Sequence, residues 1–386
     1  MRPSRRLEQV QPYLFAELGR KIAAKRAAGA DVISLGIGDP DTPTYEPVVS
    51  AAQRAVADPS THTYPTNWGR TEFRDAVSAF YARRFGVELD PENEVMAAIG
   101  GKECIFNLNL AFLDPGDVAL ASDPGYPVYT GGPLLAGAEP VLMPLIPERG
   151  FVPDLQAISQ GQLERARIMF LNYPNNPTGA VVPDGFFAQA VELADRYDLL
   201  IVHDNSYSEI TFDGYVAPSF LATPGAREVG VEVFSLSKGY NMTGWRCAAI
   251  VGNAEAIGHY HRLKTNIDSG VFEAVQLAGA AALAPDTDDA VRAMSAVYQR
   301  RRDLVCTALA DAGVAVTPPK GTIYVWAPTP PGFESDAAYC EHVLAHAAVA
   351  ISPGGAYGPS GEGFFRISLT TPEDRLLTAL ERIRRL

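Results

Sequence analysis

The sequence predicts an α/β protein with a mostly parallel central sheet and a smaller α+β unit. In the middle of the chain, short apolar runs of strand length alternate with helical patterns, as in a parallel sheet covered on both faces. From about residue 286 a long helix is followed by separate strands and helices, which indicates a second unit. We therefore expect an arm and part of the small unit in 1–45, a large unit in 46–285, and the remainder of the small unit in 286–386.

The expected elements follow from apolar periodicity and from glycine and proline stops. The first part of the chain predicts a helix over 18–28 ending at Gly29, a strand over 32–35, a loop over 36–43, and an amphipathic helix over 72–84 ending at Gly86. The central part predicts strands at 95–99, 117–121, 168–171, 199–203 and 231–234, with helices at 102–113 and 184–196. The last part predicts a helix at 286–311, a strand at 322–326, a helix at 336–348 and a strand at 363–369.

Composition argues against several classes of function. The 386 residues are 47% hydrophobic, which is enough to bury a sizeable core. The net charge of −13, without blocks of like charge, argues against a nucleic acid or an anionic membrane as partner. Apolar runs stay below the ~20 residues of a membrane helix, and the first residues lack a signal-peptide pattern. Four scattered cysteines without CxxC spacing predict no metal site and favour a reduced, cytoplasmic setting.

Polar groups follow five of the predicted strands. In an open parallel sheet, ligands bind beyond the carboxyl ends of the strands, so we expect these groups to meet at one edge. They are Gly100-Gly-Lys-Glu103, Ser122-Asp-Pro-Gly-Tyr126, Asn172–Gly179, Asp204-Asn-Ser-Tyr207 and Ser235-Leu-Ser-Lys238.

Together these groups match the needs of pyridoxal phosphate. Lys238 offers the amine for a Schiff base with the cofactor aldehyde, and Asp204 offers the carboxylate that keeps the ring nitrogen protonated. Once released by substrate, Lys238 is placed to move the proton as general base and acid. Asn176 and Tyr207 are expected to donate to the phenolate oxygen, and Tyr126 to stack on the ring. The expected phosphate ligands are the backbone of Gly101 and Lys102, with Ser235, Ser237 and Arg246. The candidate catalytic residues are therefore Lys238, Asp204 and Tyr207.

Each of these residues also has a simpler interpretation. Asp204 alone is as often a helix cap or turn residue, and Asn176 beside prolines is by default a turn former. Arg246 is compatible with a surface ion pair, and Tyr126 with packing. Their occurrence at successive strand ends favours the cofactor site over five separate local roles.

Other catalytic motifs match less well. The segment Ser235-Leu-Ser-Lys238 also fits SxxK, but the Ser-Asp-Asn and Lys-Thr-Gly motifs of the penicillin-recognising hydrolases are absent. The pair His203-Asp204 suggests a triad, but GxSxG is absent, so His203 is interpreted as a core residue. Neither GxGxxG nor a Walker A motif occurs.

Asn172–Gly179, Asp204–Tyr207 and Ser235–Arg246 resemble the fold-type I pyridoxal phosphate aminotransferases of class I/II. Further motifs look like those of the LL-diaminopimelate aminotransferase group, and the resemblance covers nearly the whole chain. These motifs are Tyr13-Leu-Phe15, Leu35-Gly-Ile-Gly-Asp-Pro-Asp41, Gly101-Lys-Glu103, Asp123-Pro-Gly-Tyr-Pro-Val-Tyr129, Asn241-Met-Thr-Gly-Trp-Arg246, Asn266-Ile-Asp-Ser-Gly270 and Tyr357-Gly-Pro-Ser-Gly-Glu-Gly363.

The resemblance implies the PLP-dependent transferase fold of type I and transfer of an amino group between an amino acid and a 2-oxo acid through a Lys238 Schiff base. It also implies a homodimer with shared active sites, in which Tyr64 reaches the partner's cofactor phosphate. Arg366 matches the arginine that clamps the substrate α-carboxylate, for which a bidentate guanidinium is suited. The other residues expected on the substrate side are Gly36, Ile37, Asn176, Tyr13 and Asn67.

Some positions depart from the group. It usually has serine at Gly101, glycine at Cys104 and threonine at Gly239, and it tends to carry a carboxylate near Asn67-Trp68. Changes beside the lysine and in the substrate wall leave a PLP-dependent elimination, replacement or cyclisation as the alternative reaction. A regulatory use of the fold normally comes with an added DNA-binding domain and does not suit the acidic balance.

Overall fold

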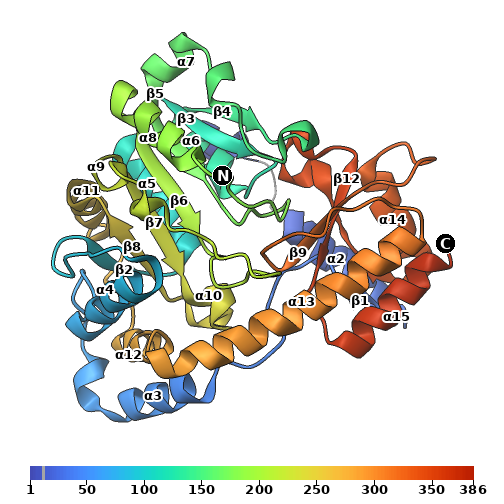
Figure 1. The fold of residues 1–386 in the computed structure, drawn as a ribbon, viewed down its shortest axis with the longest axis horizontal. Helices are drawn as coiled ribbons and strands as arrows, with labels where there is room; N and C mark the ends of the chain where they lie inside the picture. The colour runs from blue at the N-terminus through green and yellow to red at the C-terminus, as the bar shows by residue number, and fades with distance from the viewer. Residues whose placement is uncertain (11–13) are drawn as a thin grey trace.

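A seven-stranded sheet forms the centre of the larger part of the molecule in the computed structural model, which describes residues 1–10 and 14–386 (Figure 1). Neighbouring strands pair in parallel except around β8, which runs antiparallel to both neighbours. The mostly parallel sheet expected from the sequence is thereby confirmed, while β4 and β8 are additional strands. The spatial order is β2 (Val95–Ala98), β8 (Ala248–Gly252), β7 (Gly230–Ser235), β6 (Leu200–Asn205), β5 (Ala166–Leu171), β3 (Val118–Asp123) and β4 (Glu139–Pro144).

Both faces of this sheet are buried under helices. Along β3, Val118 and Leu120 belong to one hydrophobic cluster, and Ala119 and Ala121 to the other, because successive strand residues point to opposite faces. One face is covered by α3 (Glu46–Ala57), α4 (Thr71–Phe85), α8 (Phe186–Tyr197) and α12 (Glu273–Ala282). The other is covered by α5 (Gly101–Phe112), α6 (Val128–Ala136) and α11 (Ala254–Lys264). Shorter helices are α7 (Gln160–Arg165), α9 (Ala226–Val229) and α10 (Leu236–Gly239).

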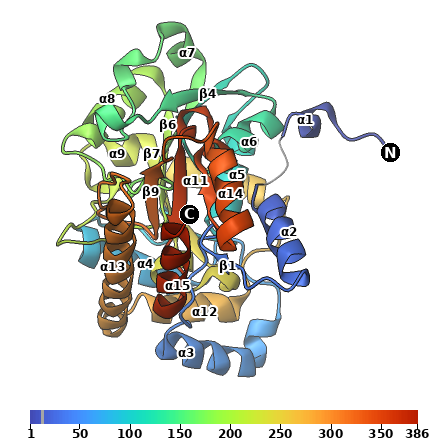
Figure 2. The same cartoon turned by 90° about the vertical axis from the view of Figure 1, so that its right-hand side faces the viewer.

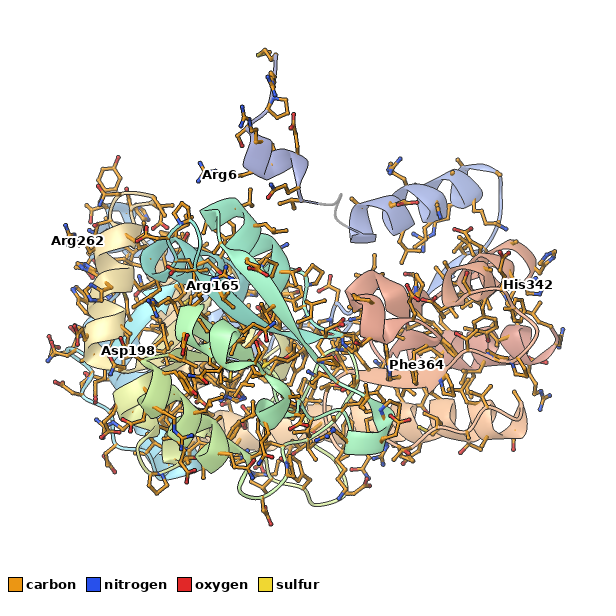
Figure 3. All side chains as sticks on the ribbon, turned by 90° about the horizontal axis from the view of Figure 1, so that it is seen from above. Arg6, Arg165, Asp198, Arg262, His342 and Phe364 are labelled. Atoms are coloured by element: carbon orange, nitrogen blue, oxygen red, sulfur yellow. The ribbon has the colours of Figure 1, made fainter. Side chains whose placement is uncertain are left out.

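A second hydrophobic core lies under a small antiparallel sheet at the C-terminal end of the chain (Figure 2). Its strands, in spatial order, are β11 (Ser352–Pro353), β12 (Phe364–Ser368) and β9 (Tyr324–Pro328), and β1 (Ile33–Ser34) pairs in parallel with β10 (Val349–Ala350). Its helices are α13 (Asp288–Asp311), α14 (Asp336–Ala347) and α15 (Glu373–Arg384), with α2 (Leu14–Ala27) packed alongside. The short helix α1 (Arg5–Glu8) projects from the surface and contacts α6 (Figure 3).

Local backbone conformation explains where elements end. Helix α4 stops at Gly86 as expected, since this glycine is left-handed at φ 68° and caps the last turn. Helix α8 begins at Phe186, later than expected, because Gly185 is left-handed at φ 80°. Strand β9 begins at Tyr324, because Thr322 is left-handed at φ 73° and turns the chain. Across the described ranges, no helix has the length and apolar character needed to cross a membrane.

Strands β6 and β7 are joined beneath the sheet edge by the buried carboxylate of Glu232. It accepts hydrogen bonds from the Tyr81 hydroxyl at 2.8 Å, the Ser219 hydroxyl at 2.9 Å and the Asn205 amide at 3.2 Å. Nδ1 of His203 lies 2.8 Å from its other oxygen, which places His203 in the core as expected. Burial alone would raise the pKa of Glu232, but hydrogen bonding and charge from His203 hold this pKa below its ordinary value. The network fixes the two strands that precede the candidate catalytic residues.

Replacing Tyr81 by phenylalanine should destabilise the fold without changing its packing. The ring stays buried among aromatic neighbours, but Glu232 loses one donor. We expect the free energy of unfolding to fall by about 1.5–3 kcal/mol, the range for a buried hydrogen bond to a charged group. Urea denaturation of Tyr81→Phe beside Tyr197→Phe, a half-buried tyrosine on α8, measures this. Equal midpoints for the two variants would show that the hydrogen bond from Tyr81 contributes nothing to stability.

Candidate active site

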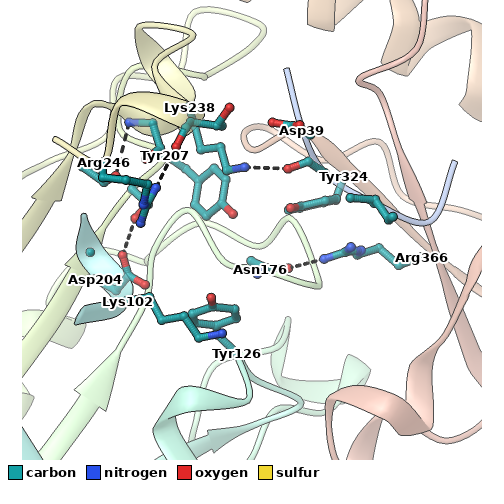
Figure 4. A pocket seen from close by; sticks show the side chains of 17 residues that line it. Asp39, Lys102, Tyr126, Asn176, Asp204, Tyr207, Lys238, Arg246, Tyr324 and Arg366 are labelled. Carbon is teal, nitrogen blue, oxygen red and sulfur yellow. Dashed lines mark hydrogen bonds between the residues drawn. The ribbon is translucent and has the colours of Figure 1, made fainter. Parts of the chain in front are cut away.

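A cavity of about 360 Å³ opens where the carboxyl ends of β2, β3, β5, β6 and β7 meet. It is the edge of the sheet that the sequence predicts as the ligand site. The predicted residues that line it are Ile37, Gly101, Lys102, Tyr126, Asn176, Asp204, Tyr207, Ser235, Ser237, Lys238, Arg246 and Arg366 (Figure 4). It is also lined by Gly38, Asp39, Ser206, Thr243 and Tyr324.

Among the described residues, three that are expected at the site do not line this cavity. Gly36 lies behind it, where its carbonyl accepts a hydrogen bond from Arg366 at 2.9 Å. Tyr64 is 87% exposed and Asn67 is also exposed, on the outer surface of the larger part of the chain. Tyr13 falls outside the described residues.

Lys238 is presented to the cavity by the short helix α10, directly after β7. Ser235 caps this helix by accepting a hydrogen bond from the Ser237 N–H at 3.2 Å. The amine of Lys238 donates to the carbonyl of Gly38 at 2.5 Å. Removal from water lowers the pKa of this amine. Tyr324 and Asp39 oppose that effect, and the positive charges of Arg366 and Arg246 add to it. A lowered pKa leaves more of the amine neutral at a given pH, as a nucleophile or general base requires.

Asp204 sits near the end of β6 with both carboxylate oxygens held by hydroxyl groups. Tyr129 donates to one oxygen at 2.8 Å, and Ser206 donates to the other at 2.5 Å. Tyr129 is itself fixed by stacking on Phe170, with ring centroids 5.3 Å apart. Burial raises the pKa of Asp204, and these hydrogen bonds oppose that rise. The result is an oriented, buried carboxylate that suits a cationic ring nitrogen.

Positive groups and hydroxyls gather at one end of the cavity, where α5 begins. The N-terminus of α5 at Gly101 presents the positive end of the helix dipole. Arg246 lies directly against Gly100, where a Cβ would approach its Nη2 atom to 2.0 Å, and Gly100 is left-handed at φ 80°. Nη1 of Arg246 donates to the Thr243 carbonyl at 2.7 Å. This end of the cavity suits a phosphate group.

A buried arginine forms the opposite side of the cavity, with Lys238 between the two arginines (Figure 4). Arg366 of β12 is 1% exposed, and its Nη1 atom donates to Oδ1 of Asn176 at 2.7 Å. Its guanidinium carbon lies 3.8 Å from the ring centre of Tyr324 and 4.7 Å from that of Tyr357. A buried guanidinium in contact with two aromatic rings suits a planar carboxylate.

Comparison with known proteins agrees with this geometry. The family model for aminotransferases of class I and II matches residues 30–383. The LL-diaminopimelate aminotransferase of Desulforudis audaxviator is 52% identical over 381 residues, covering 99% of this chain and 97% of that protein. The LL-diaminopimelate aminotransferase of Moorella thermoacetica is 51% identical over 385 residues, covering 100% of this chain and 98% of that protein. The chain therefore belongs to the aminotransferase class I and II family.

Solved structures show the same fold. Substrate-bound BacF from Bacillus subtilis has a TM-score of 0.97 and 36% identity, covering 100% of this chain and 98% of that one. A Thermus thermophilus aspartate aminotransferase double mutant has a TM-score of 0.92 and 32% identity, covering 100% of both chains.

The fold is that of the fold-type I aminotransferases, and the reaction is pyridoxal phosphate-dependent transfer of an amino group between an amino acid and a 2-oxo acid. The predicted fold class, cofactor and enzyme class are confirmed, and the relatives do not favour elimination, replacement or cyclisation. The cavity fits the cofactor because it combines a cationic end for phosphate, a buried carboxylate at Asp204 and an amine at Lys238.

Several residues at the site carry no expectation from the sequence. Ser206 and Tyr129 hold the Asp204 carboxylate and lie inside motifs that the sequence analysis identifies, so their position in those motifs could have indicated a role at the site. Asp39 also belongs to such a motif, in the loop after β1. Tyr324 has no comparable signal, because it comes from β9 in the second core, where strand ends predict no ligand site.

Introducing a Cβ at Gly100 should weaken cofactor binding. An alanine there would meet the Arg246 guanidinium and displace it from the phosphate end. We expect the pyridoxal phosphate Kd of Gly100→Ala to rise about ten- to a hundredfold, the factor for one lost charge-assisted hydrogen bond. Absorbance titration of the apo protein measures it. Gly86→Ala is the control, since Gly86 is also left-handed but nothing lies within 4 Å of its Cβ position. A Kd equal to that of the control would contradict the assignment.

Proposed function

We propose that this aminotransferase acts on LL-diaminopimelate or a closely similar amino dicarboxylate, with a 2-oxo acid as the other reactant. The observation that carries the proposal is Arg366, a buried guanidinium across the cavity from Arg246 with Lys238 between them. Relatives named LL-diaminopimelate aminotransferase, 46–52% identical over nearly the whole chain, support this substrate class.

The residues of the cavity take the following roles. When bound, the cofactor supplies an electron-withdrawing ring beside the substrate α-carbon. Lys238 takes the proton from that α-carbon, since its lowered pKa leaves the amine available as a base. Asp204 holds the positive charge of the ring nitrogen, fixed in turn by Tyr129 and Ser206. Tyr126, Asn176 and Tyr207 line the cavity, and we propose that Tyr126 stacks on the ring while Asn176 and Tyr207 donate to its phenolate oxygen.

Phosphate binding falls to the groups at the start of α5 and around α10. Backbone N–H groups at a helix N-terminus attract an anion, and charge-assisted hydrogen bonds strengthen its binding. The residues proposed for it are Gly101, Lys102, Ser235, Ser237 and Arg246, with Tyr64 from a second subunit.

Arg366 binds the substrate α-carboxylate. Its Nη1 bond to Asn176 and its Nη2 bond to the Gly36 carbonyl orient the guanidinium from two sides. Ile37, next in the chain, lines the same side of the cavity. A lysine at 366 cannot offer two parallel N–H donors, so the planar carboxylate would be held less well.

The active unit is proposed to be a homodimer whose subunits share their active sites. Tyr64, Ile267 and Phe272 are 87%, 50% and 46% exposed. Their two segments are adjacent, because a Cβ at Gly270 would lie 3.2 Å from Pro65. An exposed apolar patch of this kind is typical of an interface. It brings Tyr64 and Asn67 to a surface from which they can reach a partner's cavity.

A cytoplasmic location is part of the same proposal. All four cysteines are buried and free. Proteins without disulfides are typical of reducing compartments.

Incubation with a panel of amino donors and product mass spectrometry tests the reaction. We expect LL-diaminopimelate to lose an amino group while 2-oxoglutarate becomes glutamate. Lys238→Ala should lower turnover by at least about a thousandfold, because the amine is lost as nucleophile and base. Lys320→Ala, which removes an exposed lysine, should keep the parent rate. A panel in which no donor converts 2-oxoglutarate to glutamate would disprove the proposal.

Mixing two impaired variants tests the shared site. We expect Lys238→Ala and Tyr64→Ala each to be impaired alone. After subunit exchange, half of the dimers are mixed and each has one intact site, so about one site in four regains activity. Steady-state rates of the mixture against the separate variants measure this. A mixture that equals the mean of its components would place each site within a single subunit.

A further inference from the structure

Tyr324 lines the cavity together with Arg366, the proposed carboxylate site, and Lys238, which carries the amine. It is the first residue of β9 and is 4% exposed, yet its side chain lines the cavity (Figure 4). The Arg366 guanidinium carbon lies 3.8 Å from the centre of its ring. The ring of Tyr207 meets it edge-on, with centroids 6.0 Å apart.

The hydroxyl of Tyr324 lies beside the segment that contacts Lys238. A Cβ at Gly38 would come within 2.0 Å of this hydroxyl, and the Gly38 carbonyl accepts the hydrogen bond from Lys238. Burial alone would raise the pKa of Tyr324. The charges of Arg366 and Lys238 outweigh this effect together with hydrogen bonding with Tyr207, so the pKa is lowered. The hydroxyl therefore lies against the Gly38 segment to which Lys238 donates, with the ring of Tyr207 beside the Tyr324 ring.

The backbone before Tyr324 is strained in a way that fixes its position. Thr322 is β-branched and buried, but it is left-handed at φ 73°, a conformation that such residues rarely adopt. Its hydroxyl accepts a hydrogen bond from the Tyr324 N–H at 3.2 Å, and its own N–H donates to the Ile210 carbonyl at 3.0 Å. Strain of this kind persists where the surroundings enforce it, and it clusters at functional sites.

We propose that Tyr324 is a positioning residue for amino transfer, whose ring holds the plane of the Arg366 guanidinium for the substrate carboxylate and whose hydroxyl holds Tyr207 and Lys238 in place. The inference rests on the role proposed for Arg366. Stacking of a desolvated guanidinium on an aromatic face corresponds to about two- to thirtyfold in affinity. The two parts of the side chain therefore act on different steps, binding and turnover.

Variants of Tyr324 separate these two parts. Tyr324→Phe keeps the ring, whereas Tyr324→Leu and Tyr324→Met remove it. Tyr339→Phe, a buried tyrosine of the same core outside the cavity, is the matched control. The holoenzyme variants are compared by KM and kcat, and by calorimetric titration with glutarate, a dicarboxylate without an amino group. Circular dichroism confirms that each variant is folded.

We expect Tyr324→Leu and Tyr324→Met to bind glutarate about tenfold more weakly, with KM raised to match. Tyr324→Phe should bind glutarate within about twofold of the parent but show a kcat about tenfold lower, since one hydrogen-bonding group is lost. Tyr339→Phe should match the parent in all three measurements.

Parent-like glutarate binding by whichever ring-removing variant folds would overturn the role of the ring. A parent-like kcat for Tyr324→Phe would overturn the role of the hydroxyl. Arg366→Lys distinguishes failure of the underlying proposal. If that variant binds glutarate as the parent does, Arg366 is not the carboxylate site, and the role of the ring fails with it. If it does not, a failure at Tyr324 leaves the proposed function standing.

Discussion

The parallel pairing of β6 with β7 is the constraint on which the site depends. Asp204 stands opposite Val233, so the carboxylate and the turn that carries Lys238 leave the sheet at the same edge. A shift of one residue would turn Asp204 to the other face of the sheet. Glu232 is buried and pairs with His203 in the same register. It disfavours such a shift, because its carboxylate would lose its hydrogen-bond partners.

Two arginines on opposite sides then determine what the cavity accepts. Each is held by its own surroundings: Arg246 rests against a glycine at the start of α5, and Arg366 lies between aromatic rings of the second core. Both also favour the neutral amine of Lys238, because a nearby positive charge disfavours a second one. In the proposed function, the same two charges bind the anionic groups and favour the neutral amine of Lys238.

Most groups of the proposed cofactor side could be predicted from the sequence because they follow parallel strands, and parallel strands end together. The substrate side could not be derived in this way. Tyr324 comes from an antiparallel strand whose start is set by the left-handed Thr322, and periodicity alone extends that strand back through 322. Arg366 was found through a resemblance, not through strand ends. Tyr64 and Asn67 show the limit of a single chain, since their side chains point to its surface.

Gly239, which follows Lys238, stands where the LL-diaminopimelate aminotransferase group usually has threonine, and its packing explains this difference. A Cβ at Gly239 would lie 2.9 Å from Cβ of Glu209, which does not line the cavity. Glu209 is largely buried and pairs with Arg84 at 3.0 Å, so its side chain fills the space where a threonine would stand. The substitution beside the lysine is thus matched by a neighbour on the far side from the cavity. Neither Gly239 nor Glu209 lines the cavity, so this departure gives no reason to invoke another reaction.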